Sequence, residues 1–236
     1  MRVHEFHREI WAKAYGLVCD DTKSIILIDP VYDYTELYES YISEHSLNLH
    51  AVIATHTHAD HITACFTLKN IYQCDYIMHE STASLGVTKF VNDSSSLQFG
   101  GHSICFHHVP GHTNDSMIVD TGSHLFTGDF LFTGEAGVGR DDLPSGRMEH
   151  HWNSLAKMNS LNRESIMYTG HEPPRTEMKT LAWNMDNNPI LKMSSFEEFE
   201  HWQLETIAKL GSVSKIKTAL PANLFGEVPD HIPWLS

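Results

Sequence analysis

Cysteine is scarce in this chain and never closely paired. The four cysteines, Cys19, Cys65, Cys74 and Cys105, include no C-x-x-C pair, and three of them lie among apolar neighbours. This pattern argues against a disulfide framework and against a metal site built from thiolates. We therefore expect buried thiols in a reducing compartment.

The sequence also lacks an excess of basic residues and any long apolar run. It has 16 Lys and Arg against 30 Asp and Glu, a net charge of −14, so nothing attracts nucleic acid or anionic lipid. No apolar run reaches the ~18 residues of a membrane helix, and residues 1–7 lack the apolar core of a secretory signal. We expect a cytoplasmic protein without a nucleic-acid or membrane partner. The length of 236 residues predicts one domain over 1–236.

Histidine, in contrast, is abundant, and one short segment concentrates it. Of the 18 histidines, three lie in Thr55-His56-Thr57-His58-Ala59-Asp60-His61, together with one aspartate. The preceding residues, 49–54, are typical of a buried strand that would hold these side chains rigidly. Imidazoles with one carboxylate suit zinc, iron or manganese. A polar loop that is rich in histidine by chance is the alternative, but this spacing directly after an apolar strand is far more specific.

The spacing inside the segment predicts how the ligands are presented. His56 and His58 are separated by one residue, which on an extended loop places both on the same side. Residues 62–71 are typical of a helix, so we expect Asp60 and His61 to project from its first turn, where Asp is electrostatically favoured. The sequence thus predicts ligands that leave a strand end and enter a helix.

Elsewhere the chain is predicted to begin with strands and then to alternate strands and helices. We expect strands at 11–19, 24–28, 49–54, 76–78, 103–109, 117–120, 124–127 and 165–169. Helices are expected at 35–45, 62–71, 149–158, 176–185 and 195–210. A glycine-rich loop at 135–146 is long enough to be functional, and the apolar tail at 220–225 should pack back on the fold.

Three further residues repeat the pattern of a ligand next to glycine at a strand end. They are His112 in Pro-Gly-His-Thr, Asp129 in Thr-Gly-Asp-Phe and His171 in Thr-Gly-His-Glu. Glycine allows the backbone to turn sharply and approach closely, so a neighbouring ligand can be directed at a shared centre. For each residue alone, a turn in which the side chain caps its own backbone is an equal alternative. Their joint occurrence after the first segment favours ligands.

These residues resemble the metallo-β-lactamase superfamily over nearly the whole chain. The H-x-H-x-D-H signature of that family matches His56, His58, Asp60 and His61, and its later ligands match His112, Asp129 and His171. The resemblance implies an α/β fold, a four-layer αβ/βα sandwich with the site at one edge of two packed sheets. It also implies up to two metals, one held by His56, His58 and His112 and the other by Asp60, His61 and His171, with Asp129 bridging.

Within the superfamily the chain looks most like the persulfide dioxygenases. The segments that carry this likeness are 28–31, 57–63, 137–140 and Pro221-Ala222-Asn223. The likeness implies one Fe(II) per chain on His56, His112 and Asp129, with His58, Asp60, His61 and His171 in a second site or in contact with the ligands. Asp60 is also the candidate catalytic residue. The implied reaction oxidises glutathione persulfide with O2 to sulfite and glutathione.

Glyoxalase II is the alternative within the same superfamily. It implies two zinc ions, or mixed zinc and iron, and a metal-activated water that attacks a glutathione thioester. The sequence departs from the expected glutathione contacts, because Pro173 and Met185 stand where a tyrosine and an arginine would be. The thiol carrier could thus be glutathione or a smaller molecule.

Arg140 is the candidate substrate-binding residue, because its planar guanidinium can hold a carboxylate in two hydrogen bonds. An ion pair within its own loop, at Asp141 or Asp142, is an equal alternative.

The tail at 220–225 could also contribute to a homodimer contact.

Overall fold

The computed structural model describes residues 1–235, which form two β-sheets. The first sheet has six strands in the order β1-β2-β3-β4-β5-β6. The pairs β1–β2 and β2–β3 are antiparallel, and the following three pairs are parallel. Its strands are β1 (Arg2–Glu5), β2 (Tyr15–Cys19), β3 (Ser24–Ile28), β4 (Asn48–Ile53), β5 (Asp75–His79) and β6 (Lys89–Val91).

The second sheet has five strands in the order β11-β10-β9-β8-β7. All neighbours in it are antiparallel except β10 and β11, which run parallel. Its strands are β7 (Ser96–Phe99), β8 (His102–His108), β9 (Met117–Asp120), β10 (His124–Gly128) and β11 (Ile166–Thr169).

The alternation of side chains along β3 explains how the first sheet is covered on both faces. Ile25 and Leu27 point to a core shared with α1 and α2, whereas Ile26 and Ile28 point to a core shared with the second sheet. Successive residues of a strand face opposite sides, so a continuous apolar run fits a strand that is buried on both faces. The predicted reading of 24–28 as a fully buried strand is confirmed.

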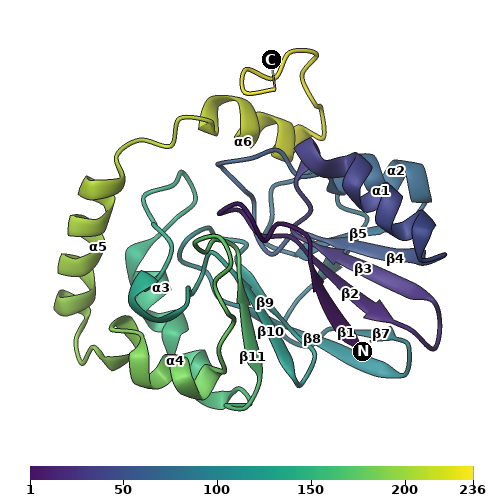
Figure 1. Ribbon diagram of the computed structural model, residues 1–236. Helices are drawn as coiled ribbons and strands as arrows, with labels where there is room; N and C mark the ends of the chain where they lie inside the picture. The colour runs from purple at the N-terminus through teal and green to yellow at the C-terminus, as the bar shows by residue number, and fades with distance from the viewer. Residues whose placement is uncertain (236) are drawn as a thin grey trace.

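Helices cover the outer face of each sheet, which gives four layers (Figure 1). The first sheet is covered by α1 (Thr35–Glu44) and α2 (Cys65–Tyr72). The second is covered by α3 (Met148–Leu155), α4 (Leu181–Asn187) and α5 (Phe196–Leu210). Short 3-10 turns lie at Tyr32–Tyr34, Gly134–Ala136, Ala156–Ser160 and Ile190–Lys192. The predicted four-layer αβ/βα arrangement is confirmed.

The last helix, α6 (Ile216–Phe225), lies at one end of the sheets, between α5 and the pair α1 and α2 (Figure 1). Its Ala219 and Ala222 pack against Ile62, which lies in the loop after β4. The tail therefore packs back on the fold, as predicted, and reaches the segment that carries the first four candidate ligands.

The prediction that Asp60 and His61 project from the first turn of a helix is wrong. The helix α2 begins at Cys65, and residues 54–64 form a loop. Contacts to other segments hold this loop out of helical conformation: Tyr32 N donates to Ile62 O, and Ala64 N donates to Pro30 O. Thr63 also pairs with Val31 in an isolated bridge. These contacts use backbone groups that a longer helix would need for itself.

Two other elements begin four or more residues away from their predicted starts, and three short strands were not predicted. The strand expected at 11–19 begins at Tyr15, because Lys13 N donates to Gly170 O outside the first sheet. The helix expected at 176–185 begins at Leu181, where the Thr180 side chain caps it by accepting from Trp183 N. The strands β1, β6 and β7 have at most four residues and no continuous apolar run.

Within residues 1–235, none of the helices is both long enough and apolar enough to cross a membrane. The single domain over 1–236, the cytoplasmic location and the homodimer stay predictions.

Candidate metal centre

The candidate ligands all follow the ends of strands at one edge of the two sheets. His56, His58, Asp60 and His61 follow β4, and His112 follows β8. Asp129 comes directly after β10, and His171 is the second residue after β11. The structure thus brings together side chains that lie up to 115 positions apart, from His56 to His171.

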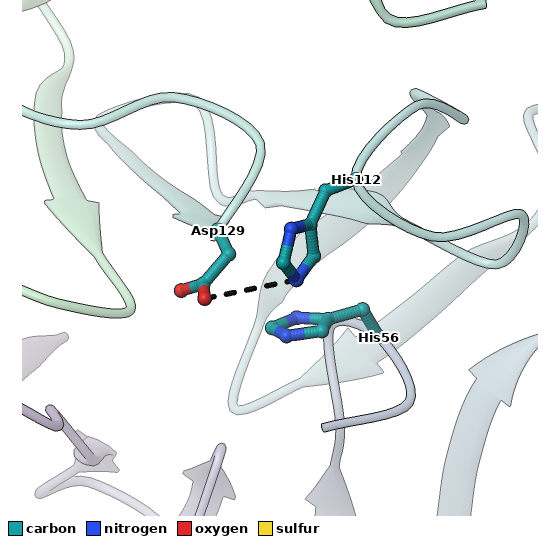
Figure 2. Close-up of side chains that lie close together, drawn as sticks. All are labelled: His56, His112 and Asp129. Carbon is teal, nitrogen blue, oxygen red and sulfur yellow. Dashed lines mark ion pairs between the residues drawn. The ribbon is translucent and has the colours of Figure 1, made fainter. Parts of the chain in front are cut away.

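Three of these residues form one group that could hold a metal ion. Each of His56, His112 and Asp129 offers a ligand atom, and the three atoms lie within 4.8 Å of one another. His112 Nε2 faces Asp129 Oδ2 at 3.7 Å, and the rings of His56 and His112 stand almost perpendicular, at 85° (Figure 2). All three side chains are buried. The arrangement is a compact face of two imidazoles and one carboxylate.

Each imidazole of this group is oriented by a hydrogen bond on its other nitrogen. His56 Nδ1 lies 2.9 Å from Thr55 Oγ1, and His112 Nδ1 donates to the carbonyl oxygen of Arg140. Both Nε2 atoms are therefore left to face the centre. Burial lowers the pKa of His56 well below its ordinary value and also lowers the pKa of His112. Neutral imidazole is the form that binds metal.

The third member, Asp129, is held by His171. His171 Nδ1 donates to Asp129 Oδ1 at 2.8 Å, and His171 Nε2 donates to Asp60 Oδ2 at 2.9 Å. Burial alone would lower the pKa of His171, but the two carboxylates raise it well above its ordinary value. Oδ2 of Asp129 is left to face His112 Nε2.

A second group lies beside the first and consists of His58, Asp60 and His61, whose ligand atoms also lie within 4.8 Å of one another. The ring centroids of His58 and His61 are 4.2 Å apart, and those of His56 and His58 are 4.1 Å apart. The two groups are thus contiguous, with His171 bonded to a carboxylate of each.

Three imidazole nitrogens in the two groups lack a hydrogen-bond partner in the part of the chain that the structure describes, as expected of atoms that bind a metal ion. Among residues 1–235, His56 Nε2, His58 Nδ1 and His61 Nε2 are buried and have no hydrogen-bond partner. An unpaired buried nitrogen is unfavourable unless another group satisfies it. Because the three atoms lie in the two groups described, a metal ion in either group would satisfy the nitrogens that face it.

Two buried aspartates support the ligand segment, a role that no sequence motif predicted for them. Asp29 accepts from Thr55 N at 2.7 Å and from His58 Nε2 at 3.2 Å. Asp115 accepts from Thr57 N at 3.1 Å and from Thr113 Oγ1 at 2.6 Å. The sequence feature that could have revealed the role of Asp29 is its position directly after the buried strand β3. Asp115 offered no comparable signal.

The glycines next to the ligands have the role that the sequence predicted. At Gly170 a Cβ atom would overlap Asp129 Oδ1, so only glycine allows His171 to approach this carboxylate. Gly128 has a φ of +51°, which favours glycine, and a Cβ there would overlap Thr55 Oγ1.

Arg140 lies at the site but is held within the protein. Its Nε and Nη2 donate to the two carboxylate oxygens of Asp142 at 2.6 and 2.7 Å, and its Nη1 donates to Gly211 O at 2.8 Å. The ion pair within its own loop, one of the two predicted alternatives, is therefore present. A contact of Arg140 with substrate stays a prediction.

A cavity of about 420 Å³ opens over the first group. Its lining residues include Asp60, His112, Asp129 and His171, together with Arg140. The site is therefore open to a small molecule.

Comparison with known families agrees with this arrangement. The model of the metallo-beta-lactamase superfamily matches residues 12–171, which include all seven candidate ligands. The chain belongs to the metallo-beta-lactamase superfamily.

Members of this superfamily with two different activities are similar to the chain. It is 28% identical to the mitochondrial persulfide dioxygenase ETHE1 of Bos taurus over 209 residues, which is 86% of this chain and 80% of that protein. It is 30% identical to the hydroxyacylglutathione hydrolase GloC of Haemophilus influenzae over 204 residues, 76% of this chain and 93% of that protein. Among solved structures, ETHE1 from Myxococcus xanthus superposes with a TM-score of 0.87 at 29% identity, covering 94% of this chain and 98% of the other.

Asn223 of α6 connects the end of the chain to the ligand loop, another role that the sequence did not reveal. Its Nδ2 donates to the carbonyl oxygens of His58 and His61 at 2.9 and 2.8 Å. Its Oδ1 accepts from Thr63 N at 2.9 Å. Asn223 is buried, so no water replaces these three bonds.

We predict that Asn223→Ala lowers both the stability of the protein and the metal affinity of the loop at 54–64, which carries His58 and His61. Three buried backbone groups lose their partner, and each loss should lower the free energy of unfolding by about 1–3 kcal/mol. Metal affinity should fall by roughly 10–100-fold, as for other residues that orient ligands. Denaturant unfolding and elemental analysis measure the two effects. Asn187→Ala, which removes an exposed side chain bonded within its own helix, is the control. Equal metal content in both variants would contradict the role of Asn223.

Proposed function

We propose that this protein is a non-haem iron(II) persulfide dioxygenase that oxidises glutathione persulfide, or a related low-molecular-weight persulfide, to sulfite. The observation that supports it most is the group of His56, His112 and Asp129, of which His112 and Asp129 line an open cavity. Two imidazoles and one carboxylate on one side of an ion are the ligand set of oxygen-using non-haem iron enzymes. The similarity to two ETHE1 proteins supports the same function.

The proposed reaction consumes one O2 and one water for each persulfide. The sulfur–sulfur bond of R–S–SH breaks, the terminal sulfur is oxidised to sulfite with reduction of O2, and the carrier leaves as the thiol R–SH. When bound, iron(II) would supply open positions for the persulfide sulfur and for oxygen.

The residues of the chain would position the reactants. In this proposal His56 and His112 hold iron through Nε2, and Asp129 holds it through Oδ2. The hydrogen bond from His171 to Asp129 Oδ1 fixes the carboxylate, and Asp60 in turn fixes His171. Asp60 also lines the cavity, and its predicted catalytic role stays a prediction.

A glyoxalase II-like hydrolase with two metals is the second candidate function. It is supported by the unpaired nitrogens of His58 and His61, which with Asp60 could hold a second ion. Metal bound there would supply a water with a pKa lowered towards ~7 as the nucleophile for the carbonyl carbon of a thioester. The similarity to GloC points in the same direction.

We predict that His112→Ala and Asp129→Ala each lose iron. Removing a ligand should lower iron affinity by more than the ~10–100-fold typical of residues that only orient ligands. Elemental analysis of the purified variants measures occupancy. His102→Ala, at an exposed position of β8, is the control and should keep the occupancy of the unsubstituted protein. Full occupancy in both ligand variants would show that the metal lies elsewhere.

The two candidate functions predict different use of oxygen. Iron-loaded protein is assayed with glutathione persulfide and with S-lactoylglutathione, each in air and under anaerobic conditions. A persulfide dioxygenase takes up O2 and forms sulfite only in air, and it leaves the thioester intact. Thioester cleavage that proceeds without oxygen, together with no O2 uptake on any persulfide tested, would replace the dioxygenase by the hydrolase.

A further inference from the structure

The cavity over the metal centre has mainly apolar walls. Phe132, Val138, Leu143, Leu210 and Val213 line it, and Trp11 stands at its rim. The side chains of Trp11 and Leu210 are exposed, at 59% and 60%. Exposed apolar side chains that converge on one cavity mark a binding surface. The walls therefore favour a hydrocarbon group beside the reacting sulfur.

Permanent positive charge is nearly absent from this cavity. Of the described residues that line it, Arg140 is the only Lys or Arg. Its charge is balanced by Asp142, and its Nη1 also donates to the carbonyl oxygen of Gly211. The guanidinium keeps two unused N–H groups, which can serve one carboxylate at most.

The adjoining cavity supplies no cation either. It has a volume of about 210 Å³ and shares Ala59 and Leu143 with the first. The described residues that line it include Asp115 but no Lys or Arg. Among these lining residues, a longer substrate that extends past Leu143 would meet no side chain with a permanent positive charge to pair with a carboxylate.

Glutathione is poorly matched to these walls. It carries two carboxylates and one ammonium group, and a charged group that leaves water without a partner is strongly disfavoured. A hydrocarbon group of similar reach would instead gain about 25 cal/mol for each Å² of apolar surface removed from water. The net charge of −14 adds a repulsion against anionic substrates.

We propose that the sulfur carrier of this enzyme is an uncharged, low-molecular-weight thiol with an aliphatic or aromatic group, and that glutathione is a poor carrier. This inference rests on the proposed function only in that the reacting sulfur lies at the metal centre. With R as the hydrocarbon group, R–SSH, O2 and water give R–SH and sulfite. The apolar walls hold R in both substrate and product.

The test measures binding of the product thiols and needs no turnover. Phenylmethanethiol and glutathione are titrated calorimetrically into iron-loaded protein without oxygen, so both thiols present the same sulfur and differ in the carrier. We expect phenylmethanethiol to bind at least about tenfold more tightly, a difference of about 1.4 kcal/mol. Equal affinity, or tighter binding of glutathione, would overturn the proposal.

A pair of variants on α5 tests whether the cavity wall causes the preference. Leu210→Lys places a cation at the rim, and Leu204→Lys changes a residue that is similarly exposed, at 56%, but does not line the cavity. Leu210→Lys should reduce the preference for phenylmethanethiol by roughly tenfold, comparable to the loss of one or two methylene contacts. Leu204→Lys should leave the preference unchanged. Equal preference in both variants would show that this wall does not select the carrier.

The two proposals can fail separately in these experiments. Tight binding of phenylmethanethiol without O2 uptake on phenylmethyl persulfide would support the apolar carrier and contradict the dioxygenase. O2 uptake that is faster with glutathione persulfide than with phenylmethyl persulfide would support the dioxygenase and contradict the apolar carrier.

Discussion

The site depends on one constraint: a buried imidazole can direct one nitrogen at a metal only if its other nitrogen is held by a fixed partner. Thr55 holds His56, the carbonyl oxygen of Arg140 holds His112, and Asp29 holds His58. These partners come from three separate segments of the chain. The fold therefore does more than bring the ligands close, because it also selects which ring nitrogen faces the centre.

The partners are themselves supported by distant residues. The loop that carries the Arg140 carbonyl is tied to α5 by Gln203, whose Nε2 donates to Gly139 O at 2.9 Å and to Asp141 Oδ2 at 2.8 Å. Asn223 of α6 likewise holds the loop of His58 and His61, because its Nδ2 donates to the carbonyl oxygens of both residues. The helices α5 and α6 thus both contact loops of the candidate metal centre, and Leu210 of α5 also lines the cavity.

Local patterns in the sequence predicted much of this fold. The buried strand β3, the strands β9 and β10 and the helix α1 were each expected from local sequence patterns, and the structure confirms them. Membership of the metallo-beta-lactamase superfamily was expected from the resemblance of His56, His58, Asp60 and His61 to the signature of that family, and the family model confirms it. The four-layer arrangement followed from that resemblance.

The remaining features depend on contacts between distant segments, which no local pattern records. The loop at 54–64 replaces a predicted helical turn because Val31, Pro30 and Asn223 bind its backbone. The hydrogen bond from Arg140 to the carbonyl oxygen of Gly211, 71 positions along the chain, was likewise not predictable from the loop itself. The sequence also could not show that the cavity walls are apolar, because they combine residues from Trp11 to Val213.

The central claim is that one ion lies on His56, His112 and Asp129, and anomalous X-ray scattering tests it most directly. Crystals of iron-loaded protein are measured on both sides of the iron absorption edge. We predict a single anomalous peak per chain within bonding distance of His56 Nε2, His112 Nε2 and Asp129 Oδ2. A second peak beside His58, Asp60 and His61, or a single peak located there, would contradict the claim.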